Sequence, residues 1–371
     1  QYKDTSHSYD RTAMVCWAMP SRDRPDMNDK SEGAPRRDIV RSPRPWAGFA
    51  TSIVLSIAIL LWLWHRHALV WTSLKTRWAT ADHALLVAVF GGSAAFHIAA
   101  GAFKLHRVLR SMGVDIRWNE TLRVRLGAGP VRAFLPFSTG EIIHVLYFRA
   151  RKRMTVADTS GIMIFDKSMN LIGSLWWLAL GIFLASEPRI QLGILRQASS
   201  VPVALIAALL AVSFIIVFIP SIHRHVADAA MIIHPRVGEI VSGMLSPFRQ
   251  LHTVQKIELL IYGVVFQLRP IVVCFFLLRS LAVPVRWVDT LLAASAAVCA
   301  GYLPGFVVGS GPRETVLVEA FGAAYGPVEA IFLGGLLMTF AVNVFPALLG
   351  LPWTVWFLRR LRRSDVTGRK G

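Results

Sequence analysis

The sequence predicts an all-α protein that crosses a membrane about seven or eight times, and three observations predict it. Hydrophobic residues make up 54% of the 371 residues, and the mean hydropathy is +0.50. Charged residues make up only 17%, whereas a soluble domain carries about 25%. The apolar residues come in long blocks, several of which approach the roughly 20 residues that a spanning helix needs.

The composition also argues against several classes of function. The net charge is +18 and the pI is about 10.8, but the basic residues cluster at the ends of apolar blocks, as positive-inside placement and anionic lipid favour. No motif that reads a nucleic-acid groove accompanies them, so nucleic acid is not an expected partner. The three cysteines have no zinc-binding or redox spacing, and we expect neither a metal nor a cofactor.

Taken in order, the chain begins with a polar leader, residues 1–44, which is predicted to be disordered. A transmembrane domain is predicted at 45–358 and a basic cytoplasmic tail at 359–371. The predicted spans are residues 46–64, 84–103, 160–185, 201–219, 259–278, 287–303 and 327–358. The last is long enough to contain a break near Asn343 or Pro346.

The basic residues predict the orientation. They follow the second span, precede the third, follow the fourth and close the last, and placing all of them in the cytoplasm leaves both termini there. These residues are Lys104, Arg107, Arg110, Arg117, Arg123, Arg125, Arg149, Arg151, Lys152, Arg153, His223, Arg224, His225, Arg359, Arg360, Arg362 and Arg363. The expectation is a multi-pass protein of the bacterial inner membrane, with residues 226–256 along the cytoplasmic interface. In this orientation the basic loop at residues 65–77 faces the outside of the cell, which is an exception to the positive-inside rule.

Two apolar stretches, residues 126–147 and 302–325, are too interrupted to span plainly. Their glycines and prolines are Gly127, Gly129, Pro130, Pro136 and Gly140 in the first, and Pro304, Gly305, Gly309, Gly311 and Pro312 in the second. Non-helical backbone at membrane depth is tolerated only inside protein or beside a water-filled cavity. Paired broken segments in two halves of a chain indicate a binding site. We therefore predict pseudo-symmetric halves with two re-entrant segments around a polar cavity.

Each broken segment places one glutamate in the first turn of a helix. Thr139 is a plausible N-cap before Glu141, and Pro312 suits the first helical position before Glu314. A helix N-terminus offers N–H donors to an anion such as phosphate. A carboxylate would repel that phosphate, so we expect the glutamates to orient arginines or to carry a coupling proton. The alternative is that each glutamate only complements its own helix dipole, worth about 0.3–1 kcal/mol.

Other ionisable residues lie at membrane depth or flank the broken segments, and such residues are functional candidates. They are Arg132, Arg149, Asp166, Lys167, Arg269 and Arg313. Asp166 and Lys167 are adjacent on a helix and do not face each other, so each needs a partner elsewhere in the bundle. A purely structural ion pair is the alternative for them.

Two matches to enzyme motifs do not predict catalysis. The spacing of His223 and Asp228 fits an acyltransferase pair, but it lies in a basic run without a companion motif. The run Gly309-Ser310-Gly311 faintly resembles a serine protease motif, but no histidine base follows His252. No catalytic residue is expected.

In the two broken segments, residues 135–141 read LPFSTGE and lead to Arg149, and residues 309–314 read GSGPRE. These segments resemble the signature regions of the lysylphosphatidylglycerol synthase transmembrane (flippase-like) family. Residues 326–330 (GPVEA) and Gly350-Leu351 follow in the family's order, and Asp166 would correspond to an acidic position of the family. The resemblance spans residues 46–358. Pro312 and Lys167 depart from the family's usual residues.

The resemblance implies a stand-alone lipid-translocating or lipid-binding module, without the soluble aminoacyltransferase domain of bifunctional relatives. The leading hypothesis is a lipid transporter in which Arg132, Arg269 and Arg313 hold an anionic or modified headgroup. The lipid could be an anionic phospholipid, an aminoacyl-lipid or a polyprenyl or glycolipid. The alternatives are a non-transporting partner of a lipid- or glycan-synthesis enzyme and a lipid-modifying membrane enzyme. The sequence is also compatible with a homo-oligomer.

Overall fold

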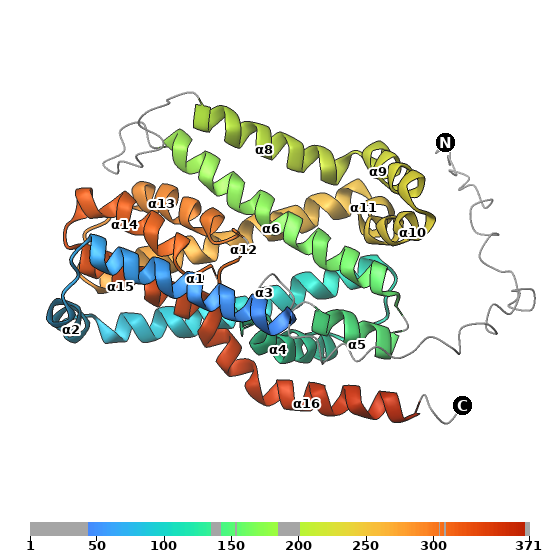
Figure 1. Ribbon diagram of the computed structural model, residues 1–371, viewed down its shortest axis with the longest axis horizontal. Helices are drawn as coiled ribbons and strands as arrows, with labels where there is room; N and C mark the ends of the chain where they lie inside the picture. Colours follow the sequence, from blue (N-terminus) through green and yellow to red (C-terminus); the bar gives the residue numbers. More distant parts are fainter. Residues whose placement is uncertain are drawn as a thin grey trace, which may run out of the picture. The chain divides into compact units, whose positions relative to one another are not determined.

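The computed structural model describes residues 44–134, 142–152, 154–184, 201–303, 305–307 and 309–367. Every element in these ranges is a helix, which confirms the predicted fold class (Figure 1). The helices are α1 (Arg44–Arg66), α2 (Trp71–Ala79), α3 (His83–Ser111), α4 (Trp118–Phe134), α5 (Ile142–Lys152), α6 (Val156–Leu184), α8 (Val201–Phe218), α9 (Pro220–Ile233), α10 (Pro235–Met244), α11 (Ser246–Gln250), α12 (Thr253–Ser280), α13 (Trp287–Ala300), α14 (Pro312–Tyr325), α15 (Val328–Thr339), η4 (Phe340–Val344) and α16 (Phe345–Thr367). Residues Trp46–Gly371 form one compact unit.

Four described helices are long and apolar enough to cross a membrane: α3, α6, α12 and the continuous Val328–Phe357. Two bent pairs pass the same test together, α1 with α2 at 96° and α8 with α9 at 81°, which gives up to six spans. The predicted number of seven or eight also counted the two broken segments and residues 287–303. The helix there, α13, is only 14 residues long, because the chain leaves helical geometry at Gly301.

The last span contains the predicted break, and the break is a π-helix, η4. A π turn leaves carbonyls outside the α pattern, and two of them accept hydrogen bonds from other helices. Ser93 Oγ donates to the Ala341 carbonyl at 3.2 Å, and Arg269 Nη2 donates to the Val342 carbonyl at 3.3 Å. The break therefore joins the last span to α3 and α12.

The bend between α8 and α9 is closed by buried polar side chains. Pro220 begins α9 and has no N–H to donate. Lys256 Nζ donates to the Val217 carbonyl at 3.1 Å, and the His223 ring contacts the Ile216 carbonyl. Helices α9, α10 and α11 contain most of residues 226–256, which were predicted to lie along the interface, and Ile232 is 86% exposed there.

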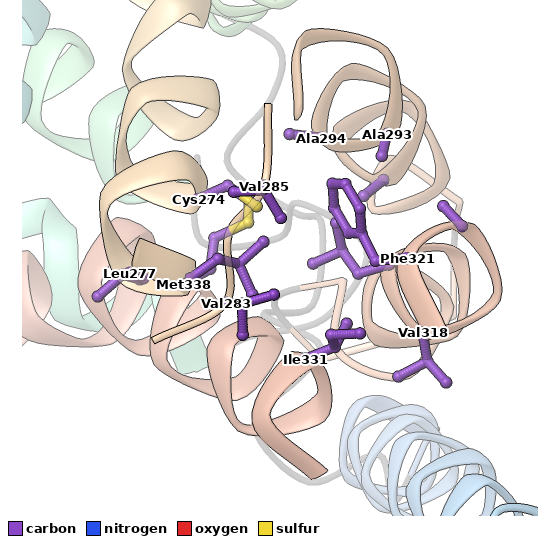
Figure 2. Close-up of a cluster of buried hydrophobic side chains, with 14 of the residues drawn as sticks. Cys274, Leu277, Val283, Val285, Ala293, Ala294, Val318, Phe321, Ile331 and Met338 are labelled. Carbon is purple, nitrogen blue, oxygen red and sulfur yellow. The ribbon is translucent and has the colours of Figure 1, made fainter. Parts of the chain in front are cut away.

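A hydrophobic cluster fixes α13, α14 and α15 against α12. Phe321 of α14, Ile331 of α15 and Cys274 of α12 are at most 1% exposed and belong to it. Figure 2 shows these side chains pointing toward one another, with Ala293 and Ala294 of α13 beside them. This cluster packs α14 against α12, α13 and α15, and it thereby fixes the position of the start of α14 in the bundle.

Helices α6 and α12 approach closely through glycines, as helices in membranes commonly do. A Cβ on Gly263 would lie 2.6 Å from the Met169 carbonyl oxygen, and a Cβ on Gly173 would lie 2.8 Å from the Gly263 carbonyl oxygen. Both neighbours are backbone atoms, which cannot move without moving a helix. The two glycines therefore set the distance between α6 and α12.

Gly263→Ala is expected to lower the free energy of unfolding by about 1–3 kcal/mol, because overpacking forces the two backbones apart. Thermal unfolding of the purified protein in detergent measures the change. The matched control is Gly92→Ala on α3, where a Cβ would meet nothing within 4 Å. Equal midpoints for the two variants would show that the α6–α12 contact does not limit stability.

Candidate functional site

The bundle contains a partly open cavity of about 420 Å³, within the usual size range of ligand sites. Its walls come from α3, α4, α6, α12, α16 and the segment between α13 and α14. The charged side chains that line it are Arg125, Asp166, Lys167, Arg269 and Arg313. Among the described lining residues, four cations thus face one carboxylate, and the cavity carries an excess of positive charge.

The second broken segment forms one wall, and α1 supports its backbone. Gly305, Gly309 and Gly311 have φ of +101°, +74° and +100°, which residues with a side chain rarely adopt. The N–H of Val307 donates to Ser56 Oγ of α1 at 3.0 Å. Non-helical backbone at this depth is thus satisfied by protein groups.

Helix α14 begins at Pro312, as predicted, and Glu314 lies in its first turn. The Glu314 side chain is fully buried. Its Oε2 accepts from the Gly311 N–H at 2.6 Å, and its Oε1 accepts from Thr339 Oγ1 at 2.7 Å. The geometry is that of a cap on its own helix, which was the alternative prediction. Glu314 is not among the residues that line the cavity.

Arg313 turns into the cavity and is only 6% exposed. Its Nη1 donates to Thr339 Oγ1 at 3.1 Å, so Thr339 links the guanidinium to the Glu314 carboxylate. Its Nε has no hydrogen-bond partner within the described part of the chain. A Cβ on Gly301 would lie 2.7 Å from Arg313 Nη2. The glycine leaves a slot that the guanidinium fills.

Arg269 lies in the middle of α12 and is 8% exposed. Its Nη1 donates to the Ser93 carbonyl at 3.5 Å, and its guanidinium lies 5.4 Å from the ring centre of Phe266. With the bond to the Val342 carbonyl, these contacts fix the orientation of the guanidinium between α3 and the last span.

Asp166 has the distant partner that the sequence required, and it is Lys104 of α3. The two side chains form an ion pair at 3.0 Å, and Lys104 Nζ also donates to Asn170 Oδ1 at 2.7 Å. Lys104 is 3% exposed. The prediction that Lys104 and Arg125 lie in a basic loop is wrong, since Lys104 belongs to α3, which continues to Ser111, and Arg125 belongs to α4 and lines the cavity.

Most of the other predicted site residues lie outside the described part of the chain or away from the cavity. Glu141, Pro136 and Gly140 lie outside the described residues, and so does the side chain of Arg132, whose backbone belongs to α4. Arg149 is exposed on α5 and does not line the cavity. Sequence reasoning missed several polar residues at the cavity or its borders: Lys104, Arg125, Asn170, Gln267, Tyr302 and Thr339. Of these residues only Lys104 could have been found from the sequence, because it directly follows the predicted span 84–103 and so lies close to membrane depth.

The residues of the acyltransferase-like spacing do not meet. The His223 ring is buried 5.3 Å from that of Phe248, whereas Asp228 is exposed. No described residues form a group of three or more metal-ligating side chains.

These features define a class: a multi-pass integral membrane protein whose helical bundle contains a basic, partly open cavity. The family model described as the lysylphosphatidylglycerol synthase TM region matches residues 49–350. The chain belongs to this family, as the motifs around Glu141 and Glu314 indicated. A comparison with curated proteins found no match.

Proposed function

We propose that this protein binds the phosphate of a lipid headgroup in its cavity and moves that lipid between the two leaflets. One observation carries the proposal: Arg269 and Arg313, from two different helices, are almost fully buried and line the same cavity. Arginine at membrane depth is costly and marks substrate pathways. Its planar fork of N–H donors matches phosphate oxygens better than lysine does.

The surroundings of the two arginines support an anionic ligand. Arg269 donates to two backbone carbonyls, and Thr339 links Arg313 to the Glu314 carboxylate by hydrogen bonds to both. Asp166 is the single described carboxylate on the cavity wall, and Lys104 already balances it. The phosphate of a lipid headgroup would bind beside the two arginines, while its acyl chains stay in the bilayer.

The proposal extends to the setting of the protein. It acts in the bacterial inner membrane with both termini in the cytoplasm, because that placement leaves most basic block ends inside. It performs no covalent chemistry of its own. A lipid- or glycan-synthesis enzyme that supplies or uses the headgroup is the proposed partner.

Transport of fluorescent phosphatidylglycerol in reconstituted vesicles tests the function. Wild type is expected to expose the lipid of the inner leaflet to dithionite quenching, and Arg313→Gln to slow this by about tenfold or more. Such a loss corresponds to one charge-assisted hydrogen bond.

The control is Arg123→Gln on α4, whose exposed guanidinium lies 5.7 Å from the ring centre of Trp356 and not in the cavity. This variant is expected to transport like wild type. If wild type, both variants and protein-free vesicles all quench at one rate, transport is excluded.

A further inference from the structure

The junction of α15 and the π-helix η4 holds both buried arginines of the cavity. Thr339, the last residue of α15, accepts from Arg313 Nη1 through its hydroxyl at 3.1 Å. Three residues later, within η4, the Val342 carbonyl accepts from Arg269 Nη2 at 3.3 Å. A rise of about 1.5 Å per residue puts these two positions within about 5 Å of each other along the helix axis. One short stretch of the last span thus anchors two charges that come from α12 and α14.

The two anchors differ in how they depend on the side chain. Val342 offers its backbone carbonyl, which any residue has, whereas Thr339 offers a hydroxyl. A hydroxyl carries one proton and two lone pairs. That proton is donated to Glu314 Oε1 at 2.7 Å, so a lone pair accepts from the Arg313 guanidinium. The carboxylate therefore fixes the direction of the hydroxyl, and the hydroxyl holds the arginine.

This series of contacts is buried throughout. Thr339 and Arg313 are each 6% exposed, and Glu314 is fully buried. Glu314 is itself held by the Gly311 N–H at 2.6 Å. A bond lost inside such a network is not replaced by one to water, so its former partners must rearrange. The position of the Arg313 guanidinium therefore depends on the Thr339 hydroxyl as well as on the slot at Gly301.

We propose that Thr339 is a positioning residue of the phosphate site: its hydroxyl, oriented by Glu314, holds Arg313 where the guanidinium meets the phosphate of a lipid headgroup. The inference rests on the proposed function and adds to it a residue that touches no lipid, since Thr339 does not line the cavity. Binding groups must be held within about 0.5 Å of their productive position by such supporting hydrogen bonds. Removing the hydroxyl is therefore expected to weaken the binding of the headgroup.

Competition between lipids measures that weakening. The full chain is reconstituted in phosphatidylcholine vesicles with a trace of fluorescent phosphatidylglycerol, and unlabelled phosphatidylglycerol is added as the competitor. Thr339→Val, which keeps the branched shape without the hydroxyl, is expected to raise the amount of competitor that halves transport by about tenfold. Thr339→Ser, which keeps the hydroxyl, is expected to need the wild-type amount.

Ser93→Ala is the matched control, because it also removes a buried hydroxyl that is bonded to η4. Ser93 is 5% exposed, and its Oγ donates to the Ala341 carbonyl at 3.2 Å. The Ser93 carbonyl that accepts from Arg269 belongs to the backbone and is kept. This variant is expected to lower the thermal midpoint as Thr339→Val does and to leave the amount of competitor unchanged. If both variants change the competition equally, a loosened helix explains the effect and Thr339 has no positioning role.

A double variant tests whether Thr339 acts through Arg313. Thr339→Val is expected to add no further loss to Arg313→Gln, because the two changes remove the same interaction. Additive losses would overturn the positioning role. If Thr339→Val does not fold, Thr339→Cys takes its place, since a thiol is a weak donor and a weak acceptor.

The remaining outcomes separate this inference from the proposed function. If Thr339→Val needs the wild-type amount of competitor, Thr339 does not position Arg313, although the proposed function survives. If wild type transports no phosphatidylglycerol, the proposed function itself fails. Inorganic phosphate at the concentration of the competitor is expected to have no effect. Equal competition by inorganic phosphate would show that the site holds free phosphate, and would overturn the lipid as its ligand.

Discussion

Glu314→Ala is expected to lower the free energy of unfolding by about 3–5 kcal/mol, the usual cost of removing one partner of a buried charged network. The carboxylate is fully buried and holds the Gly311 N–H and the Thr339 hydroxyl. Without it, the first turn of α14 loses its cap and the buried Arg313 loses its only nearby anion within the described residues. Thermal or denaturant unfolding in detergent measures the loss.

Two further variants test whether the loss comes from the buried position and from the charge of Glu314. Glu319→Ala removes an exposed glutamate of the same helix, whose ion pair with Arg66 spans 3.2 Å, and should cost less than about 1 kcal/mol. Glu314→Gln keeps an acceptor without the charge and should cost about 1–2 kcal/mol. Glu314→Ala with wild-type stability would contradict the capping role. Glu314→Gln with wild-type stability but no transport would instead support the coupling proton that the sequence suggested.

Gly301→Ala is expected to slow lipid transport about tenfold while the protein stays folded. Gly301 has φ of −67°, which alanine adopts without strain. The new methyl group would meet Arg313 Nη2 at 2.7 Å, and this is the far end of a flexible side chain. The guanidinium can therefore swing away without moving a helix, and the proposed phosphate site of Arg269 and Arg313 would be lost without any change of charge. Vesicle transport and thermal unfolding are measured on the same preparation.

A double variant tests the mechanism behind this prediction. If the methyl group acts only by displacing Arg313, then Gly301→Ala adds no further loss to Arg313→Gln, because the two changes remove the same interaction. Gly92→Ala, in open space on α3, should transport like wild type. Additive losses would show that Gly301 acts on the cavity by another route.

The sequence predicted the fold where one physical signal dominates. Long apolar blocks, with the glycine- and proline-rich run before Glu314, were enough to place the spans and the start of α14, because lipid and helix termini tolerate few alternatives. The break near Asn343 was predicted for the same reason. Its π geometry was not, since nothing local distinguishes a π turn from a kink.

The cavity was predicted only in part. Arg269 stood out because it interrupts an apolar block, whereas Lys104 and Arg125 lie at block ends, where positive-inside placement explains any cation. Lys104 is buried and Arg125 half-buried because α3 runs past the predicted end of its span and α4 packs beside it. Such a contact depends on the register between two helices, which one sequence does not reveal.

The π-helix Phe340–Val344 has a consequence for the helix that follows it. A π turn holds one more residue than an α turn, and each residue of a helix turns it by about 100°. Relative to an uninterrupted helix, α16 is therefore rotated about its own axis by roughly that angle. The rotation brings Pro346 and Ala347 to the cavity wall and Gly350 onto the Leu126 carbonyl of α4. Deleting a single residue from this turn would present a different stripe of α16 to the cavity and turn Gly350 away from α4.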